Sequence, residues 1–166
     1  MKPFSLKRVE KSDLLLIHRL NEGCVPHVNS IPVDDFKWYL NVLEHFYKVV
    51  DDDGVLAGTV VMMKPDLDYE SVNYHWFVER YTQFLYIDRI MVSAAYRGQG
   101  VASFMYERLQ EIAREAGHLS LCCEVNVKPK NIASLALHEK IGFRSVGTQL
   151  TENGTKEVTL LMKQVS

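Results

Sequence analysis

The sequence predicts one mixed α/β domain over residues 1–166, with a central twisted mixed β-sheet flanked by about four helices. Two observations predict this fold class. Runs rich in β-branched and aromatic residues alternate with segments whose apolar residues recur every three or four positions. Short turn sequences at residues 51–54 and 153–154 each join two strand-like runs, which is typical of hairpins. The expected order of elements is β-α-α-β-β-β-α-β-α-β-β.

Local signals place the first elements. Ser5–Glu10 is expected to form a short first strand. Ser12 is a good N-cap for a helix that ends at Gly23, and Asp34 or Asp35 can cap a second helix. The next two expected strands form a hairpin, at Tyr47–Val50 and Val55–Met63.

The later elements are recognised in the same way. An expected short helix begins at Asn131 and ends before Gly142. A longer helix ending near Gly117 is predicted by an apolar stripe of Val101, Met105, Leu109, Ile112 and Ala116. The expected strands are Phe84–Val92, Leu119–Val127, Gly147–Thr151 and Thr155–Met162.

The connection at residues 64–83 is longer than a turn requires. Connections of this length inside compact domains are usually functional or partly structured. In one interpretation the connection lies on the surface and is anchored by Trp76 and Phe77, which pack into the core. The other makes it a wall of an acceptor pocket, because aromatic side chains bury area while keeping polar groups. In that case the selectivity residues are Asn73, Tyr74, His75 and Trp76.

Composition excludes several classes of function. A formal net charge of −2 gives no general attraction to nucleic acid or to anionic membranes. The sequence has neither a long apolar run that predicts a transmembrane helix nor an apolar N-terminal stretch typical of a signal peptide. The six histidines are scattered, without the spacing of a metal site. We therefore expect a cytoplasmic protein without a metal, whose three cysteines are reduced, buried thiols.

The most informative segment is YRGQGVA at Tyr96–Ala102, between an expected strand and an expected helix. Free backbone N–H groups converge at a helix N-terminus, where the helix dipole adds partial positive charge. Glycines let the backbone approach an anion closely. The segment therefore predicts a pyrophosphate site. A plain turn with a surface arginine is the simplest alternative.

A dinucleotide-binding turn is a second alternative. Gly98 and Gly100 are followed at the right spacing by Ser103, and Glu124 lies where a ribose-binding acid is expected. That fold needs several further βα units after the motif, whereas one short helix and few strands remain here. Position in the chain therefore favours the remaining interpretation, an acyl-coenzyme A pyrophosphate loop.

Residues 97–102, RGQGVA, match the Arg/Gln-x-x-Gly-x-Gly/Ala signature of the GNAT superfamily of N-acetyltransferases. The chain resembles this family from about Phe84 to Gly147, and earlier only the order of elements agrees. Three further features fall at the family's places: Val92 closes the preceding strand, Asn131 and Ser134 open a short helix, and Gly142-Phe143 ends it.

The resemblance implies that the chain transfers an acetyl group from acetyl-CoA to an amine of a small molecule or peptide. A domain that binds acyl-CoA without catalysis is the alternative. The oligomeric state stays open, with a homodimer as one candidate. The implied coenzyme A residues are Ile90, Met91, Val92, Arg97, Gly98, Gln99, Gly100, Val101, Ala102, Ser103, Asn131 and Ser134.

Acetyl transfer requires a neutral amine, a polarised carbonyl, and a proton or hydrogen bond for the leaving thiolate. In the resembling family the leaving-group acid is commonly a tyrosine seven residues after the asparagine that opens the helix. Counting from Asn131 gives His138, whose imidazole can donate a proton near neutral pH. The alternative is a satisfied histidine within a helix. Direct attack by the amine is implied, and a covalent route through Cys122 or Cys123 competes with it.

The base on the amine side has two candidates. Some family members place a glutamate five residues before that asparagine, where this chain has Asn126, a candidate acceptor contact. Glu124 lies two residues earlier, on the same face of a regular strand. Asp88 lies on the strand before the glycine loop, where a carboxylate is costly unless it is paired or used. The alternatives are a salt bridge for Asp88 and a hydrogen bond from Glu124 that fixes the Asn126 segment.

Overall fold

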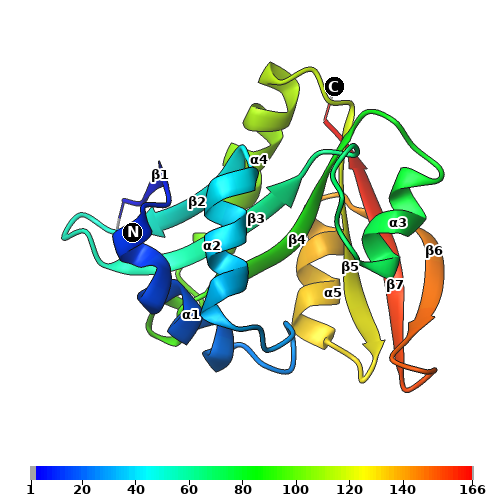
Figure 1. The fold of residues 1–166 in the computed structure, drawn as a ribbon, viewed down its shortest axis with the longest axis horizontal. Helices are drawn as coiled ribbons and strands as arrows, with labels where there is room; N and C mark the ends of the chain where they lie inside the picture. Colours follow the sequence, from blue (N-terminus) through cyan, green and yellow to red (C-terminus); the bar gives the residue numbers. More distant parts are fainter. Residues whose placement is uncertain (1–2, 166) are drawn as a thin grey trace. The chain divides into compact units, whose positions relative to one another are not determined.

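The computed structural model describes residues 3–165, and within them are seven strands, five α-helices and two short 3₁₀-helices (Figure 1). The strands are β1 (Ser5–Arg8), β2 (His45–Val50), β3 (Leu56–Met63), β4 (Phe84–Val92), β5 (Ser120–Lys128), β6 (Arg144–Thr151) and β7 (Lys156–Gln164). The helices are η1 (Lys11–Asp13), α1 (Leu14–Gly23), α2 (Val33–Val42), α3 (Val72–Val78), η2 (Ala94–Tyr96), α4 (Val101–Glu115) and α5 (Ile132–Lys140). Hydrogen-bonded strands follow the order β1-β2-β3-β4-β5-β7-β6, which confirms a mixed α/β fold.

The chain forms two compact units, and each draws on two stretches of sequence. The first comprises Met1–Met63 and Ile87–Leu109, and the second comprises Lys64–Tyr86 and Gln110–Ser166. Strand β4 and helix α4 contribute residues to both units.

The first unit is built on the antiparallel strands β1, β2 and β3. The turn between β2 and β3 confirms the hairpin expected at residues 51–54. The Asp51 carboxylate accepts hydrogen bonds from the backbone N–H groups of Asp53 (3.0 Å) and Val55 (2.9 Å). Gly54 has φ +78°, a conformation that glycine adopts without a steric penalty.

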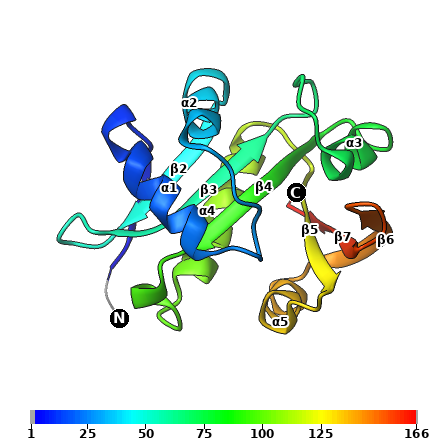
Figure 2. The same ribbon diagram turned by 60° about the horizontal axis from the view of Figure 1, so that its bottom comes forward.

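Helices cover both faces of the strands in the first unit. Figures 1 and 2 show α1 and α2 against one face and the first turns of α4 against the other. Beneath α2, Phe36 lies 5.6 Å from Tyr39 and 6.3 Å from Phe46, measured between ring centroids. On the face that α4 covers, the absence of a side chain at Gly58 leaves space for β4 and α4. A Cβ there would lie 2.7 Å from the Met91 carbonyl oxygen and 3.1 Å from Met105 Cε.

The second unit is built on β5, β6, β7 and the first residues of β4. β4 pairs with β5 in parallel through Phe84, Leu85 and Tyr86, and β7 runs antiparallel to both β5 and β6. The hairpin expected at Asn153-Gly154 is confirmed between β6 and β7. In Figures 1 and 2, α3 and α5 lie on opposite sides of these strands.

Helix α3 is a correction to the predicted order, which placed no helix between β3 and β4. The Ser71 side chain caps α3 by accepting a hydrogen bond from the backbone N–H of Tyr74 (3.2 Å). Tyr74 and Phe77, three residues apart, are fully buried. A seven-residue helix offers only two turns of periodicity, so the polar and aromatic residues around it masked the pattern.

The structure also corrects the expected helix caps. Helix α1 begins at Leu14 with Asp13 as N-cap, because Ser12 belongs to η1. Pro32 is the N-cap of α2, and the two aspartates expected to cap it lie in its first turn instead.

The expected stripe on α4 is confirmed for its first turns. Val101, Met105 and Leu109 are buried. The next fully buried residue is Ala113 rather than Ile112, and Ala116 lies beyond the end of the helix.

Candidate functional site

The glycine loop has the backbone of an anion site. Gly98 has φ +74° and Gly100 has φ +82°, conformations that L side chains rarely adopt. The backbone N–H of Phe104 donates to the Gly100 carbonyl (2.9 Å) and begins the helical ladder of α4. Helix geometry therefore gives the N–H groups of the first turn, residues 101–103, no acceptor within the helix. A Cβ added at Gly98 or Gly100 would meet nothing within 4 Å, so the loop has room for an anion.

The segment that leads into the loop is anchored at both of its ends. The backbone N–H of Ser93 donates to the Ala57 carbonyl on β3 (2.8 Å). The Tyr96 hydroxyl donates to the Asp51 carboxylate (2.6 Å) in the β2–β3 turn. This hydrogen bond, with burial, raises the pKa of Tyr96, so the hydroxyl keeps its proton near neutral pH. The hairpin turn of the first unit thus fixes the start of the glycine loop.

Several predicted coenzyme A residues are accessible in the structure. The stretch from Arg97 to Gly100 is exposed, as is Ser103 on α4. At the end of β4, Ile90 and Val92 are half-buried and Met91 is buried. An accessible loop before a fifteen-residue helix fits a pyrophosphate, since backbone N–H groups and the helix dipole both favour negative charge.

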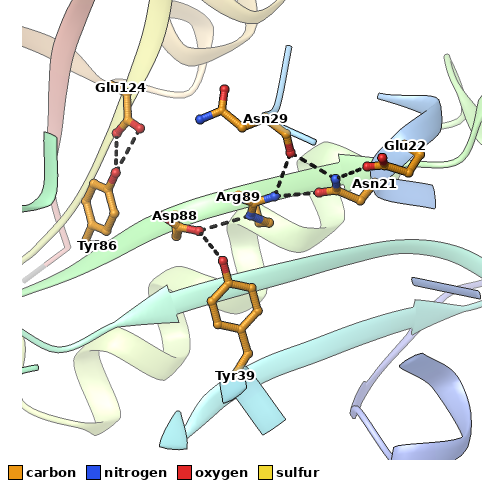
Figure 3. Close-up of polar contacts among 8 residues, drawn as sticks. All are labelled: Asn21, Glu22, Asn29, Tyr39, Tyr86, Asp88, Arg89 and Glu124. Carbon is orange, nitrogen blue, oxygen red and sulfur yellow. Dashed lines mark hydrogen bonds and ion pairs between the residues drawn. The ribbon is translucent and has the colours of Figure 1, made fainter. Parts of the chain in front are cut away.

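Asp88 lies in a buried polar network of the first unit (Figure 3). Its side chain is 6% exposed and accepts hydrogen bonds from Arg89 Nε (3.1 Å) and the Tyr39 hydroxyl (3.2 Å). Arg89 is itself 7% exposed. The interpretation that Asp88 pairs with an arginine is confirmed.

The rest of this network secures the connection between α1 and α2. Arg89 Nη1 donates to the Asn21 side-chain oxygen (2.6 Å) and to the Asn29 backbone carbonyl (3.2 Å). Asn21 Nδ2 also donates to the Asn29 carbonyl (3.0 Å) and to the Glu22 carboxylate (2.9 Å). Arg89 therefore satisfies a loop carbonyl and a buried amide while neutralising Asp88 (Figure 3).

Glu124 has a different partner. The Tyr86 hydroxyl lies 2.9 Å from Glu124 Oε1 and 2.7 Å from Oε2, so both carboxylate oxygens face one donor (Figure 3). Tyr86 is fully buried, whereas Glu124 is half-buried. Tyr86 is a partner for Glu124 that the sequence did not predict. In the Asn126 segment, the backbone N–H of Asn131 donates to the Asn126 carbonyl (3.0 Å).

Asn131, Ser134 and His138 form one local cluster on α5. The Asn131 side chain caps the helix by accepting from the backbone N–H of Ser134 (3.2 Å). His138 Nδ1 donates to the Ser134 carbonyl (2.6 Å) and lies 3.3 Å from the Ser134 hydroxyl. His138 is 4% exposed, and its ring meets the Phe143 ring edge-on.

This environment defines the protonation of His138. Burial lowers the pKa of His138, although the bond to the Ser134 carbonyl opposes that effect. A neutral ring that donates through Nδ1 carries its lone pair on Nε2, so Nε2 accepts a hydrogen bond rather than donating one. The contacts of His138 are therefore those of a hydrogen-bonded histidine within a helix, and they do not prepare Nε2 to donate a proton.

The cysteines differ in exposure. Cys122 and Cys123 are free, buried thiols, whereas Cys24 is free and only half-buried, which corrects the expectation that all three are buried. Burial, reinforced by the neighbouring Glu124, raises the pKa of Cys122 and Cys123 well above the ordinary value. A protonated thiol is a poor nucleophile, so this environment disfavours a covalent route through either residue.

The predicted acceptor residues occupy different environments in the second unit. Trp76 is half-buried, with the Arg80 guanidinium 4.1 Å from its ring centroid. The Asn73 side chain accepts from Gln149 Nε2 of β6 (2.8 Å). Tyr74 is fully buried, and its hydroxyl donates to the Lys64 carbonyl (2.5 Å). Asn126 is half-buried on β5.

The sequence-based candidates did not include the direct partners of Asp88 and Glu124, which are Tyr39, Arg89 and Tyr86. One signal was available for Tyr86. Strand alternation places it on the same face as Asp88, and a tyrosine in a buried strand needs a partner for its hydroxyl. No sequence signal names Glu124 as that partner.

Two negative findings concern the part of the chain that the structure describes. Residues 3–165 contain no group of three or more histidine, cysteine, aspartate or glutamate side chains arranged to hold a metal ion. No helix in this range is both long enough and apolar enough to cross a membrane.

Comparison with solved structures shows the same fold in other proteins, one of which is named as an N-acetyltransferase. Ard1 from Thermoplasma volcanium superposes with a TM-score of 0.77 at 16% identity, covering 98% of both chains. The ribosomal-protein-S18-alanine N-acetyltransferase from Escherichia coli gives a TM-score of 0.73 at 16% identity, covering 99% of this chain and 95% of that one. YncA from Salmonella typhimurium, solved with its cofactor acetyl-CoA, gives the same TM-score, identity and coverage.

Sequence comparison gives the family. Curated protein sequences yield no significant match to this chain. The sequence model of the acetyltransferase (GNAT) family matches residues 15–143, a range that includes the glycine loop, Asp88, Glu124 and His138. The chain therefore belongs to the GNAT family of acetyltransferases.

Proposed function

We propose that this protein is an N-acetyltransferase that moves the acetyl group of acetyl-CoA to an amine of a small molecule or peptide. The observation that carries the proposal is the glycine loop before α4. Its two positive-φ glycines, its open face and the first-turn N–H groups are suited to binding an anion, and the chain matches the GNAT family.

The loop supplies the proposed cofactor contacts. Backbone N–H groups from Gly98 to Ser103 bind the pyrophosphate, and Arg97 adds positive charge at an exposed position. The backbone at the end of β4, residues 90–92, contacts the pantetheine arm, and Asn131 and Ser134 add contacts from the start of α5. Acetyl-CoA supplies an acyl group already activated as a thioester.

Glu124 is the proposed base on the amine side. An attacking amine must be neutral, so a carboxylate that takes its proton, directly or through water, promotes the reaction. Two differences favour Glu124 over Asp88. Glu124 is half-buried and bonded to a neutral hydroxyl, whereas Asp88 is almost fully buried and paired with Arg89. An ion pair stabilises the charged carboxylate and makes it a weaker base.

The leaving thiolate needs a proton or a hydrogen bond, and His138 is the residue at the family's position for that donor. Its Nδ1–H is directed to the Ser134 carbonyl, and burial lowers its pKa. The leaving-group role of His138 therefore stays a prediction, which requires the ring to be protonated at Nε2 during the reaction.

The acceptor is proposed to be an amine that helix α3 helps to select. Trp76 offers a half-exposed aromatic surface, and Asn73 and Asn126 offer amide groups. Tyr74 contributes indirectly, by fixing the loop before α3 through its bond to Lys64. Peptide acceptors are included because one similar structure is named as an enzyme that acts on alanine of a ribosomal protein.

Thiol release from acetyl-CoA tests the proposal. The assay uses a panel of primary alkylamines, amino acids, peptides with free N-termini and lysine-containing peptides, with buffer alone as the control for hydrolysis. We expect at least one amine to raise the rate above the hydrolysis control, with the acetylated product visible by mass spectrometry. Saturable coenzyme A binding without turnover on any amine would instead identify an acyl-CoA-binding domain.

A further inference from the structure

We propose that Tyr86 is a positioning residue that holds the Glu124 carboxylate ionised and oriented, and that helix α3 braces Tyr86 for this task. The inference rests on the proposed function, in which Glu124 takes the amine proton. It assigns the α3 segment a second role besides that of an acceptor wall.

The contact between Tyr86 and Glu124 fits an ionised carboxylate. Both carboxylate oxygens lie within hydrogen-bond distance of the one phenolic oxygen, at 2.9 and 2.7 Å. An ionised carboxylate only accepts, so both oxygens can share the single phenolic proton. A protonated carboxyl group would turn one of its oxygens into a competing donor. Hydrogen bonds to an ionised acceptor are also the stronger kind, so the Tyr86 hydroxyl favours the charged form.

Tyr86 lies at the end of a strand ladder. The parallel pairing of β4 with β5 runs through Tyr86↔Cys122, and the hydroxyl reaches Glu124 two residues further along β5. The ring is fully buried, so its position is set by packing.

Helix α3 supplies that packing. The ring centroid of Tyr74 lies 5.4 Å from that of Tyr86, and the centroid of Phe77 lies 5.9 Å from it. Helix α3 is in turn held against β6. Gln149 donates to Asn73 (2.8 Å), and Trp76 lies so close to Gly147 that a Cβ there would be 2.6 Å from its ring. Strand β6 therefore supports α3, α3 packs against the Tyr86 ring, and the Tyr86 hydroxyl contacts Glu124.

Tyr74 provides a matched control within the same cluster. Tyr74 and Tyr86 are both fully buried, their rings are in contact, and each hydroxyl donates to an oxygen. The Tyr74 hydroxyl meets the Lys64 carbonyl and the Leu67 N–H, whereas the Tyr86 hydroxyl meets Glu124. Tyr74→Phe and Tyr86→Phe thus remove the same atom from the same packing, with different consequences for Glu124.

Other titratable groups near Glu124 must be considered. Tyr86 approaches it from β4, with Tyr74 of α3 behind that ring. Cys122 and Cys123 of its own strand interact with its charge, but burial keeps both thiols protonated near neutral pH. On β7, Leu160 lies opposite Glu124 in the ladder and carries no charge. Of these groups, Tyr86 is the one whose hydroxyl donates to the carboxylate, at 2.9 and 2.7 Å.

The test compares wild type, Tyr86→Phe, Tyr74→Phe and Glu124→Gln. The carbon-13 signal of the Glu124 carboxyl, assigned by its loss in Glu124→Gln, is titrated with pH by NMR in the intact protein without acetyl-CoA. In parallel, thiol release gives the pH profile of kcat/KM, and thermal melts report stability. In Tyr86→Phe we expect the Glu124 titration and the acid limb of the profile to move about one unit to higher pH. Tyr74→Phe should leave the Glu124 titration in place, and this titration alone serves as the matched comparison, because Tyr74 also fixes the loop before α3.

Several outcomes would overturn the proposal. An unchanged Glu124 titration in Tyr86→Phe would show that the hydroxyl does not control the carboxylate. An equal shift in Tyr74→Phe would assign the effect to general loosening of the cluster. Full kcat in Glu124→Gln would remove the base that Tyr86 is proposed to position. If wild type shows no turnover with any amine, the proposed function fails, while the NMR titration still decides whether Tyr86 controls the charge of Glu124.

Discussion

Asp88 and Glu124 are both strand carboxylates that the sequence offered as bases, and their partners distinguish them. Asp88 is held by Arg89 and Tyr39 in a nearly buried network. Glu124 is half-buried and faces a neutral hydroxyl. A sequence shows that two carboxylates lie on strands, but their partners come from distant segments that only the folded chain brings near. The two carboxylates are therefore expected to respond differently to removal of their charge.

Removing each charge separates these roles. Asp88→Asn removes a negative charge that is paired with the buried Arg89 and should lower the free energy of unfolding by about 3 kcal/mol. Glu124→Gln should melt closer to wild type but lose about 10²-fold in kcat, the low end for a positioned base. Urea unfolding and steady-state kinetics measure both effects. If Asp88→Asn lost kcat at unchanged stability while Glu124→Gln stayed fully active, the base assignment would be reversed.

His138 gives a prediction about pH and stability. Burial lowers the pKa of His138 in the folded protein, whereas an unfolded histidine takes up a proton near pH 6.5. Below that pH the unfolded state binds a proton that the folded state does not, so folding stability falls as pH falls. We expect the stability difference between wild type and His138→Gln to shrink when urea unfolding is moved from about pH 7.5 to about pH 5.5. A constant difference would show that the imidazole is not held neutral.

The same variant tests the catalytic prediction for this residue. A leaving-group acid predicts a loss of about 10²-fold in kcat for His138→Gln, with the Michaelis constant for acetyl-CoA almost unchanged. Full kcat with chemistry shown to be rate-limiting would leave His138 as a structural residue of α5. Counting from Asn131, as in the resembling family, identified this position from the sequence. The structure adds its environment, which is burial and a hydrogen bond to the Ser134 carbonyl.

At the scale of elements, regular patterns were predictable and short irregular ones were not. The bounds of β4 agree with the expected strand residue for residue, because a continuous apolar run leaves little choice. The loop before α4 and the cap of α5 follow from glycine and asparagine chemistry. Helix α3 was missed because its stability comes from tertiary contacts, with Tyr74 and Phe77 packed on Tyr86.

Helix α3 also carries the prediction about acceptor choice. Trp76→Ala should raise the Michaelis constant of the amine several-fold and leave acetyl-CoA affinity unchanged, because a half-exposed indole can contact the acceptor. Val72→Ala is the control, since Val72 lies on the same helix and is 61% exposed. A large drop in melting temperature with unchanged acceptor affinity would assign Trp76 to packing against Gly147 alone.

At the scale of the whole molecule, the two compact units contain different parts of the proposed chemistry. The glycine loop and its Tyr96–Asp51 anchor belong to the first unit. The Tyr86–Glu124 pair and the cluster of Asn131, Ser134 and His138 belong to the second. The family match runs across residues of both units, from 15 to 143. Pyrophosphate binding by the glycine loop is therefore expected to be separable from proton transfer by mutation.

Calorimetric titration of coenzyme A into wild type, Gly100→Ala and Gly100→Glu tests the central claim most directly. Both variants strain a residue at φ +82°, and neither side chain meets other atoms near its Cβ, so only the glutamate adds a charge against the phosphates. We expect wild type to bind, Gly100→Ala to bind more weakly, and Gly100→Glu to lose binding while melting like Gly100→Ala. Equal affinity in wild type and Gly100→Glu would contradict the pyrophosphate site and the acetyl-CoA chemistry built on it.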